Sequence, residues 1–474
     1  MQEIHVESIS LERLAGLLER PRAVQLASHA ARTQALLDGR TVWNVNSTAS
    51  GGGVAEMLQA LLAYARGAGV DARWLTIEAG PEFFRLTKRL HNWLHGSPGD
   101  GGTIDGTQRR TYEDTLMRNL SALREHVRPG DVVLLHDPQV AGLADGLREL
   151  GCHVAWRCHI GRDDPHELTE RGWEFLRPYL DQVEAVVFSR RSYAPRWVDH
   201  DRLWVIPPSL DPFSAKNCEL TDAEVRACLR RAGLVGFGDD GDGYGFVRRD
   251  GSAGTVRRHS GLVLTGGVVP AQARVVLQVS RWDRLKDMAG VLNGFIQQSA
   301  RLPEDAHLVL AGPDVSGVTD DPEGQEVLEE CLSLHRDLPR QDRERVHLCS
   351  LPMDDIDENA HLVNALQRHA SVVVQKSLVE GFGLTVTEPM WKGRAVVATR
   401  VGGIQDQIVH GESGLLVDDP RNLDELGARL RELLLDPGLA SRLGVAARER
   451  VRDRFLGDRH LVQYAELIDQ LVRR

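Results

Sequence analysis

Two carboxylates in the second half of the chain have the spacing that a two-part polar ligand needs. Glu380 lies in a glycine-bearing loop, and Glu388 follows eight residues later, inside a predicted helix over residues 384–392. One carboxylate can therefore meet the near end of a ligand, while the other meets a hydroxyl-bearing part further along. A single glutamate near a helix start is ordinary, because the helix dipole favours acids there. The interpretation therefore depends on the neighbouring residues.

The loop between the two glutamates is suited to a phosphate. Gly381 and Gly383 allow the backbone to come close to a ligand. The amides of Leu384 and Thr385 belong to the first turn of the helix, where backbone N–H groups have no partner within the helix and can bind an anion.

Two cations follow an earlier predicted strand and would flank the same anion. Arg281 can hold phosphate oxygens with its planar fork, and Lys286 adds a point charge. An isolated pair of this kind is usually solvated surface charge. Carboxylates, helix amides and cations in one chain together describe a site for a sugar nucleotide.

A glycine triplet, Gly51, Gly52 and Gly53, follows the first predicted strand and meets an amphipathic helix over residues 54–66. Backbone amides and the positive helix end make such a turn suited to an anion, and a plain flexible turn explains the triplet equally well. The stretch is neither G-x-G-x-x-G nor a Walker A loop. This argues against a dehydrogenase and against a P-loop NTPase.

Polar side chains also follow two further strands of the first half. His136, Asp137 and Gln139 come after one strand, and Arg157 and His159 come after another. A lone histidine is more often a structural hydrogen-bonding residue than a catalyst. His159 gains weight from its position rather than from its type.

These residues must be positioned by strands, and the chain alternates short apolar runs with amphipathic stretches. Near-continuous Val, Ile and Leu runs of this kind are typical of parallel sheets covered on both faces. Some twelve strands are too many for one sheet, so we predict an α/β fold of two doubly wound domains. Ligands of such sheets bind beyond the carboxyl ends of the strands, and the natural site is the cleft between the domains. The predicted strands are residues 41–45, 74–77, 131–135, 153–156, 185–188, 203–206, 274–279, 307–311, 346–348, 371–374, 395–398 and 414–417.

The domain boundary lies after the prolines of residues 206–209. We predict an N-terminal domain over residues 1–212 and a C-terminal domain over residues 213–456. Residues 233–267 hold 11 glycines, interrupt the alternation and form an insert in the second domain. We interpret this insert as a surface loop or hairpin, with a lid or partner contact over the cleft as the alternative.

The composition restricts the function classes. The 474 residues carry a net charge of −11, which argues against a general nucleic-acid binder. Six cysteines without C-x-x-C spacing make structural zinc improbable and fit reduced thiols. The N-terminus has no signal-peptide pattern, and no apolar run has the length of a membrane span. We therefore expect a cytoplasmic protein.

Taken together, the motifs resemble the family 4 glycosyltransferases of GT-B architecture. The second half carries the resemblance through Ser280-Arg281, Lys286-Asp287, the E-x7-E pair of Glu380 and Glu388, Val401-Gly402-Gly403 and Gly411-Glu412-Ser413-Gly414. The chain is also similar to the trehalose glycosyltransferring synthases, through residues 42–48, 51–58, 136–139, 156–160, 250–252 and 375–377. Gly161 departs from the family pattern, which has an acidic residue there.

The resemblance implies a role for each matching residue. Cations and helix amides would neutralise a leaving diphosphate, Glu380 would hold donor glucose hydroxyls, Glu388 would hold the ribose, and His159 would contact the donor sugar or the reacting centre. The implied catalytic set is His159, Glu380, Arg281 and Lys286. The implied donor-binding set is Gly52, Gly53, Arg281, Lys286, Glu380, Gly381, Phe382, Gly383, Leu384, Thr385 and Glu388. The weaker implied acceptor-binding set is Asn46, Asp137, Gln139 and Arg157.

The resemblance also implies a reaction, which is retaining transfer of glucose from a nucleoside diphosphate glucose to the anomeric hydroxyl of glucose. The product would be α,α-trehalose. No metal or other cofactor is expected. The partners would be small-molecule substrates, with no nucleic acid and no membrane. Whether the protein forms a homodimer stays open. The last helix, residues 457–474, would pack back on the first domain.

Three alternatives stay open from the sequence. A trehalose phosphorylase would use a similar scaffold with phosphate as co-substrate. A related glucosyltransferase would use another acceptor. A sugar-nucleotide-binding scaffold protein would keep the site without turnover.

Overall fold

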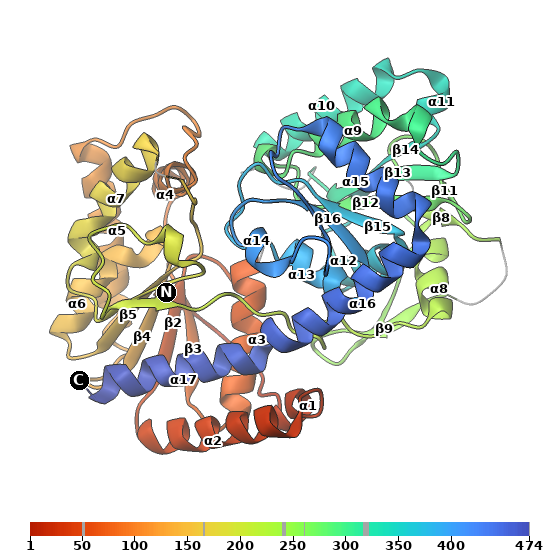
Figure 1. Cartoon of the computed structure of the whole chain (residues 1–474). Coiled ribbons are helices and arrows are strands. Elements are labelled where there is room, and N and C mark those ends of the chain that lie inside the picture. The colour runs from red at the N-terminus through yellow and green to blue at the C-terminus, as the bar shows by residue number, and fades with distance from the viewer. Residues whose placement is uncertain (50–52, 165, 239–242, 260, 316–321, 474) are drawn as a thin grey trace. The chain divides into compact units, whose positions relative to one another are not determined.

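The computed structural model describes residues 1–49, 53–164, 166–238, 243–259, 261–315 and 322–473, so the predicted donor residue Gly52 lies outside the described part. The chain forms two compact units (Figure 1). Unit 1 comprises Met1–Leu210 and Arg454–Arg474, and unit 2 comprises Asp211–Asp453. All twelve predicted strands are present in the structure, six in each unit.

Unit 1 is built on a seven-stranded sheet in the order β1-β3-β2-β4-β5-β6-β7. All neighbours are parallel except the short edge strand β1, which runs antiparallel to β3. The strands are β1 (Gln2–Ile4), β2 (Val42–Asn46), β3 (Ala72–Thr76), β4 (Val132–His136), β5 (His153–Cys158), β6 (Ala185–Phe188) and β7 (Leu203–Val205).

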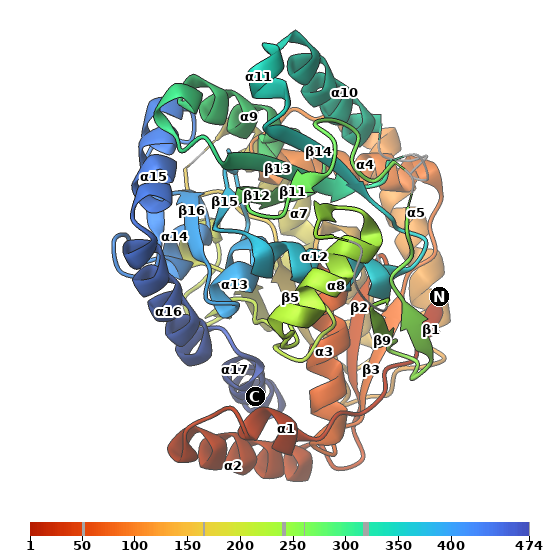
Figure 2. The ribbon, with the colours of Figure 1, turned by 90° about the vertical axis from the view of Figure 1, so that its right-hand side faces the viewer.

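Helices cover both faces of this sheet. They are α1 (Leu11–Ala15), α2 (Arg20–Leu36), α3 (Gly53–Gly67), α4 (Pro81–Leu94), α5 (Gly106–Leu123), α6 (Ala144–Glu149), α7 (Glu167–Leu180) and α17 (Gly457–Arg473), with 3-10 turns η1 (Pro138–Leu143) and η2 (Arg191–Tyr193). The last helix, α17, lies alongside α2 (Figures 1 and 2). The segment after β4 starts as the 3-10 turn η1 and becomes α-helical only at Ala144.

Unit 2 is built on a six-stranded parallel sheet in the order β14-β13-β12-β15-β16-β17. The strands are β12 (Arg274–Val279), β13 (Ala306–Pro313), β14 (Val346–Leu351), β15 (Val372–Gln375), β16 (Ala395–Thr399) and β17 (Leu415–Val417). The helices are α8 (Asp222–Ala232), α9 (Met288–Gln297), α10 (Pro322–Asp337), α11 (Arg340–Arg343), α12 (Ile356–His369), α13 (Leu384–Trp391), α14 (Ile404–Gln407), α15 (Leu423–Leu435) and α16 (Pro437–Arg454), with 3-10 turns η3 (Arg284–Lys286) and η4 (Ser299–Arg301).

Each sheet is buried on both faces because successive strand residues enter different hydrophobic clusters. In β4, Val133 and Leu135 belong to one cluster of unit 1, while Val132 and Leu134 belong to the other. Unit 2 likewise has two clusters, with alternate residues of β12 on each side. This explains why the strands appear as continuous apolar runs in the sequence.

The glycine-rich insert contains the expected hairpin. Strand β9 (Gly245–Val247) pairs antiparallel with β10 (Ala253–Thr255), and β8 (Val235–Gly236) pairs with β11 (Val269–Pro270). Tyr244 and Phe246 are buried and contact the ring of His361 on α12. The insert is therefore part of the core of unit 2.

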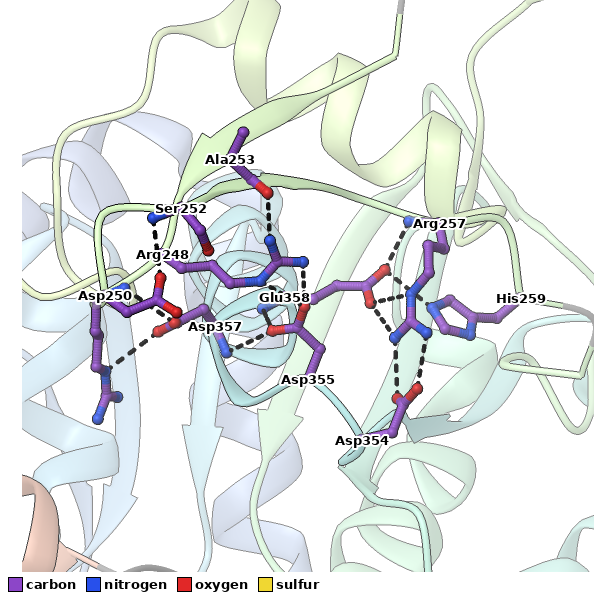
Figure 3. A network of polar contacts seen from close by, with 11 residues as sticks. Arg248, Asp250, Ser252, Ala253, Arg257, His259, Asp354, Asp355, Asp357 and Glu358 are labelled. Atoms are coloured by element: carbon purple, nitrogen blue, oxygen red, sulfur yellow. Dashed lines mark hydrogen bonds and ion pairs between the residues drawn. The ribbon is translucent and has the colours of Figure 1, made fainter.

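A network of ion pairs also fastens the insert to the start of α12 (Figure 3). Arg257 bonds Glu358 through its backbone N–H at 2.6 Å and through Nε at 2.7 Å, and Nη1 meets Asp354 at 2.7 Å. Arg248 meets Asp355 at 2.7 Å, and His259 lies 3.0 Å from Glu358.

Two further findings concern the whole described chain. The six cysteines are free thiols, and all except Cys218 are buried, as expected. None of the helices in the described ranges combines the length and the apolar character that crossing a bilayer requires.

Candidate active site

The chain order of the unit 2 sheet reverses between β12 and β15, so the loops after these two strands flank the switch point. Open α/β sheets bind ligands at this place, because neighbouring loops there lead away in opposite directions and leave a crevice. The loop after β12 carries Arg281 and Lys286, and the loop after β15 carries Glu380. The fold thus puts the predicted donor residues of unit 2 at the carboxyl ends of two neighbouring central strands.

The structure brings Lys286 and Glu380 into direct contact. The ammonium Nζ lies 2.5 Å from the Oε2 of Glu380, and the hydroxyl of Ser377 donates to the same oxygen at 3.1 Å. The two side chains are only 16% and 10% exposed. An ion pair this sheltered is weakly screened by solvent, so the two predicted catalytic groups are held in fixed positions.

Buried amide side chains hold the two loops together behind this pair. Gln278, a polar residue inside the apolar strand β12, accepts from the backbone N–H of Lys376 at 3.0 Å and donates to the carbonyl of Lys286 at 2.8 Å. The ammonium of Lys376 forms an ion pair with Asp287, which also caps α9 from a left-handed backbone conformation (φ 47°). Our sequence reasoning missed Gln278, whose signal was a polar residue within an apolar run, and it included Lys376 only in the motif of residues 375–377, without a role.

The glycine loop after Glu380 leads into α13 with its first turn uncapped. Gly383 has φ +84°, which glycine adopts without strain, and no side chain of the described residues caps the helix. The amides of Leu384 and Thr385 start this helix. The loop is held from behind, because Gln407 donates to the carbonyl of Phe382 at 2.5 Å, and a Cβ on Gly403 would lie 2.6 Å from the Phe382 Cα.

Glu388 lies eight residues after Glu380, within α13, and is 5% exposed. Gln367 of α12 donates to its Oε2 at 3.2 Å, and the ammonium of Lys216 lies 3.7 Å from Oε1. The nearby Lys392 bonds Asn217 at 3.0 Å, and burial lowers the pKa of this lysine to about 7. The carboxylate is thus oriented by partners from two other segments.

The second predicted cation, Arg281, is placed differently from Lys286. Its side chain is 53% exposed and pairs with Asp283 at 3.0 Å. A half-exposed guanidinium beside the switch point can turn towards an arriving anion, whereas Lys286 is already fixed.

In unit 1, the predicted strand-end residues His136 and His159 form part of a chain of hydrogen bonds. His136 Nε2 lies 3.0 Å from Asn44 Oδ1, and His136 Nδ1 lies 3.1 Å from His159 Nε2. Arg157 Nε donates to His159 Nδ1 at 3.3 Å. Burial and the Arg157 charge lower the pKa of His136 to about 3, and burial holds the pKa of His159 well below its usual range.

Asp137 occupies a strained position at the end of β4. Its φ of 67° with ψ of 175° lies in a region that only glycine adopts freely. Its carboxylate accepts the backbone N–H of His159 at 2.7 Å, and its carbonyl accepts from Trp156 Nε1 at 3.0 Å. Burial raises the pKa of this carboxyl to about 7. Such strain is concentrated at functional sites.

The remaining predicted acceptor residues differ in exposure. Within the described residues, Gln139 Oε1 is buried without a hydrogen-bond partner. Asn46 is 4% exposed and bonds Trp74 and the carbonyl of Thr48. Arg157 has no exposed area, and this burial disfavours the direct acceptor contact that we predicted for it.

Two glycines of unit 1 remain, namely Gly53 of the predicted donor set and Gly161, which departs from the family pattern. Gly53 is the first residue of α3, one residue before the predicted start of this helix. At Gly161, a Cβ would lie 2.1 Å from the buried ring of Tyr193. This ring explains why the chain has no acidic residue here. Among the described residues, no group of three or more His, Cys, Asp or Glu side chains is arranged to hold a metal ion.

Comparison with known proteins places both units in known families. Residues 44–195 match the family described as "Trehalose synthase, N-terminal domain", and residues 267–450 match "Glycosyl transferases group 1". A trehalose synthase of Pyrococcus horikoshii is 33% identical over 435 residues, which cover 92% of this chain and 91% of the relative.

Two further comparisons are more distant. A trehalose phosphorylase of Pleurotus pulmonarius is 26% identical over 431 residues, which cover 86% of this chain and 54% of the relative. An α,α-trehalose-phosphate synthase (UDP-forming) from Burkholderia vietnamiensis superposes with a TM-score of 0.64 at 15% identity, over 92% of this chain and 98% of its own. At this identity the likeness concerns the fold alone.

Proposed function

Because this chain belongs to the trehalose synthase family of the group 1 glycosyltransferases and has the GT-B fold, we propose that it transfers glucose from a nucleoside diphosphate glucose to glucose. The configuration at the transferred carbon is retained, and the product is α,α-trehalose. The sheltered contact between Lys286 and Glu380 at the sheet switch point carries this proposal.

The donor site neutralises charge at one end and holds hydroxyls at the other. When the bond between the sugar and the diphosphate breaks, negative charge develops on the leaving phosphate. Lys286, Arg281 and the first amides of α13 stabilise this charge, which is the main source of rate enhancement in such sites. Glu380 accepts hydrogen bonds from the donor glucose, and Glu388 accepts them from the ribose. These cations supply the positive charge, so we propose that the chemistry needs no metal.

The reaction balances without a protein nucleophile. The bond between C1 of the donor glucose and the phosphate oxygen breaks, and a bond forms on the same face between C1 and the anomeric oxygen of the acceptor. The acceptor's hydroxyl proton passes to the leaving phosphate oxygen. The acceptor residues predicted from the sequence lie in unit 1, where the unpartnered Oε1 of Gln139 can accept a sugar hydroxyl and Asp137 holds the backbone of His159 in place.

A donor-and-acceptor screen tests the proposal. We expect a non-reducing disaccharide when the protein is incubated with glucose and one of UDP-, ADP- or GDP-glucose, and loss of this product in Lys286→Ala. The absence of any disaccharide with all three donors would contradict the proposed function. The same screen with other sugars as acceptors separates a related glucosyltransferase from a trehalose-forming one.

A trehalose phosphorylase is the second candidate, because a phosphorylase relative aligns with most of the chain. This activity would release glucose 1-phosphate from trehalose in the presence of inorganic phosphate and without nucleotide.

If ligand binding and all measured activities stay unchanged in Glu380→Ala, the scaffold alternative is favoured instead. We keep the cytoplasm as the proposed location, and gel filtration decides whether the protein is a homodimer.

A further inference from the structure

A fully buried arginine lies behind His159. Arg157 has no exposed area, and none of the ion pairs found in the described ranges includes it. Besides His159, its partners are the hydroxyl of Tyr464 at 2.6 Å, the ring nitrogen Nε2 of His460 at 3.4 Å and the carbonyl of Ile206 at 2.9 Å. Burying a cation is costly unless its hydrogen bonds are satisfied. Its partners must therefore compensate for this cost.

The partners of Arg157 fix the tautomers of three histidine rings. A guanidinium only donates hydrogen bonds, so His159 Nδ1 must accept, which places the ring proton of His159 on Nε2. His159 then donates to His136 Nδ1, and His136 donates from Nε2 to Asn44. On the other side, His460 accepts at Nε2 and donates from Nδ1 to the hydroxyl of Ser209 at 2.8 Å.

Two of these partners come from the last helix of the chain. His460 and Tyr464 lie one turn apart on α17, so both face the same strand end. The helix is anchored to α2 by a bidentate contact between Arg22 and Asp458, whose shortest distance is 2.7 Å. The side chain of Arg157 thus connects the last helix to His159.

The charged and titratable groups facing His159 favour its neutral form. Arg157 of β5 is cationic, and His136 and His460 are neutral neighbours with pKa values lowered chiefly by burial. The carboxyl of Asp137, at the end of β4, accepts the backbone N–H of His159, and burial raises its pKa to about 7. Asp458 is engaged by Arg22.

We propose that Arg157, His460 and Tyr464 are positioning residues that lock His159 as a neutral ring with its proton on Nε2, so that α17 completes the catalytic site of unit 1. The proposal rests on the proposed function insofar as His159 contacts the transferred sugar. Both ring nitrogens of His159 are then engaged by protein groups, so the histidine contacts the sugar only through its ring carbons, as a fixed wall of the site, and exchanges no proton with it.

Matched variants on α17 test the positioning role. In His460→Gln the amide oxygen can still accept from Arg157, whereas His460→Leu and Tyr464→Phe each remove an acceptor. We expect His460→Leu and Tyr464→Phe to lower kcat by about tenfold or more with the donor KM within about twofold, because misplacement of a reacting group lowers the rate of the chemical step. His460→Gln should keep at least half of the wild-type kcat. An unchanged kcat in His460→Leu and Tyr464→Phe would overturn the proposal.

A second measurement does not depend on activity and needs no variant of Arg157, whose removal would leave buried acceptors of His159, His460 and Tyr464 without their donor. Nitrogen-15 spectra of the full chain with labelled histidine report the tautomer of each ring, and His→Gln variants assign the signals. We expect Nε2–H for His136 and His159, Nδ1–H for His460, and no titration of these rings between pH 5.5 and 8. A protonated or Nδ1–H ring at His159 overturns the lock. If wild-type protein lacks activity with every donor, the proposed function fails, and this spectrum still decides the tautomer.

Discussion

Lys286 and Arg284 lie two residues apart in the same short 3-10 turn, yet their environments differ. Lys286 is largely buried against Glu380, whereas Arg284 is 56% exposed and pairs with the exposed Glu326. We predict that Lys286→Ala lowers kcat by roughly 100- to 1000-fold, the range found when one preorganised charge-stabilising group is removed. Steady-state kinetics with the active donor measure this loss.

Arg284→Ala is the matched control for that variant. It removes a cation from the same turn but leaves the pair of Lys286 and Glu380 intact, so we expect activity within about twofold of wild type. Equal losses in both variants would show that the turn needs its net charge rather than the specific contact.

Asp137 makes stability depend on pH in an unusual direction. Burial raises its pKa from 3.8 to about 7, so the folded chain binds this proton more tightly than the unfolded chain does. The contribution of this carboxyl is most favourable below pH 4, decreases as the pH rises towards 7, and is constant above it. Asp137→Asn keeps an oxygen for the His159 amide and removes the charge.

We therefore compare the difference in free energy of unfolding between Asp137→Asn and wild type at two pH values. From pH 4 to pH 8.5 this difference should shift by roughly 2 to 4 kcal/mol in favour of the variant, the value of the pKa difference with allowance for partial solvent access. Urea unfolding across this range measures the difference. A difference that does not change with pH would show that Asp137 is ionised at no cost.

The sequence predicts the positions and roles of some site residues but not of others. Lys286, Glu380 and Glu388 follow strands and glycines in a recognisable order, and the structure brings Lys286 and Glu380 into contact. The role of Arg157 could not be predicted, because its burial depends on His460 and Tyr464, some 300 positions later in the chain. Strand-end position indicates where a side chain starts, whereas its direction depends on what packs over it.

At the scale of elements, α12 connects the insert to the donor site. Its first turn carries Glu358, which is completely buried and bound by Arg257 and His259, and its last turns carry Gln367, which holds Glu388. The sequence indicated a hairpin at the insert, but the pairing of insert arginines with a distant acidic helix start has no periodic signal. The ion pairs became visible only in the structure (Figure 3).

We predict that Arg257→Ala destabilises unit 2 by about 3 kcal/mol, because it leaves the carboxylate of Glu358 buried with less compensation. The neighbouring Arg258 is exposed, so Arg258→Ala should change the free energy of unfolding by less than about 0.5 kcal/mol. Thermal unfolding of the two variants compares them directly. Similar stability in both would mean that His259 and the helix start alone support Glu358.

The whole molecule has two separate pairs of hydrophobic clusters, one pair in each unit. The last helix belongs to unit 1 in these clusters, although the chain reaches it only after passing through unit 2. The positions of the strands follow from the apolar runs of the sequence, whereas the order of the strands within each sheet is known only from the structure. Membership of α17 was expected only through family resemblance, because its apolar face fits any core equally well.

This organisation predicts that each unit unfolds in its own transition. Leu467 of α17 and Leu430 of α15 are both fully buried leucines on amphipathic helices, one in each unit. Replacing either by alanine removes a buried side chain and leaves a cavity, which costs about 2 to 5 kcal/mol. Leu467→Ala should lower the midpoint temperature of the unit 1 transition alone, and Leu430→Ala should lower that of the unit 2 transition alone.

UDP should raise the midpoint temperature of the unit 2 transition only, which is the transition that Leu430→Ala lowers. Its proposed contacts lie in unit 2, and a bound ligand stabilises the unit that binds it. Calorimetry of the two variants with and without UDP measures all three shifts, and a single transition that moves in both variants would show that the two units unfold together.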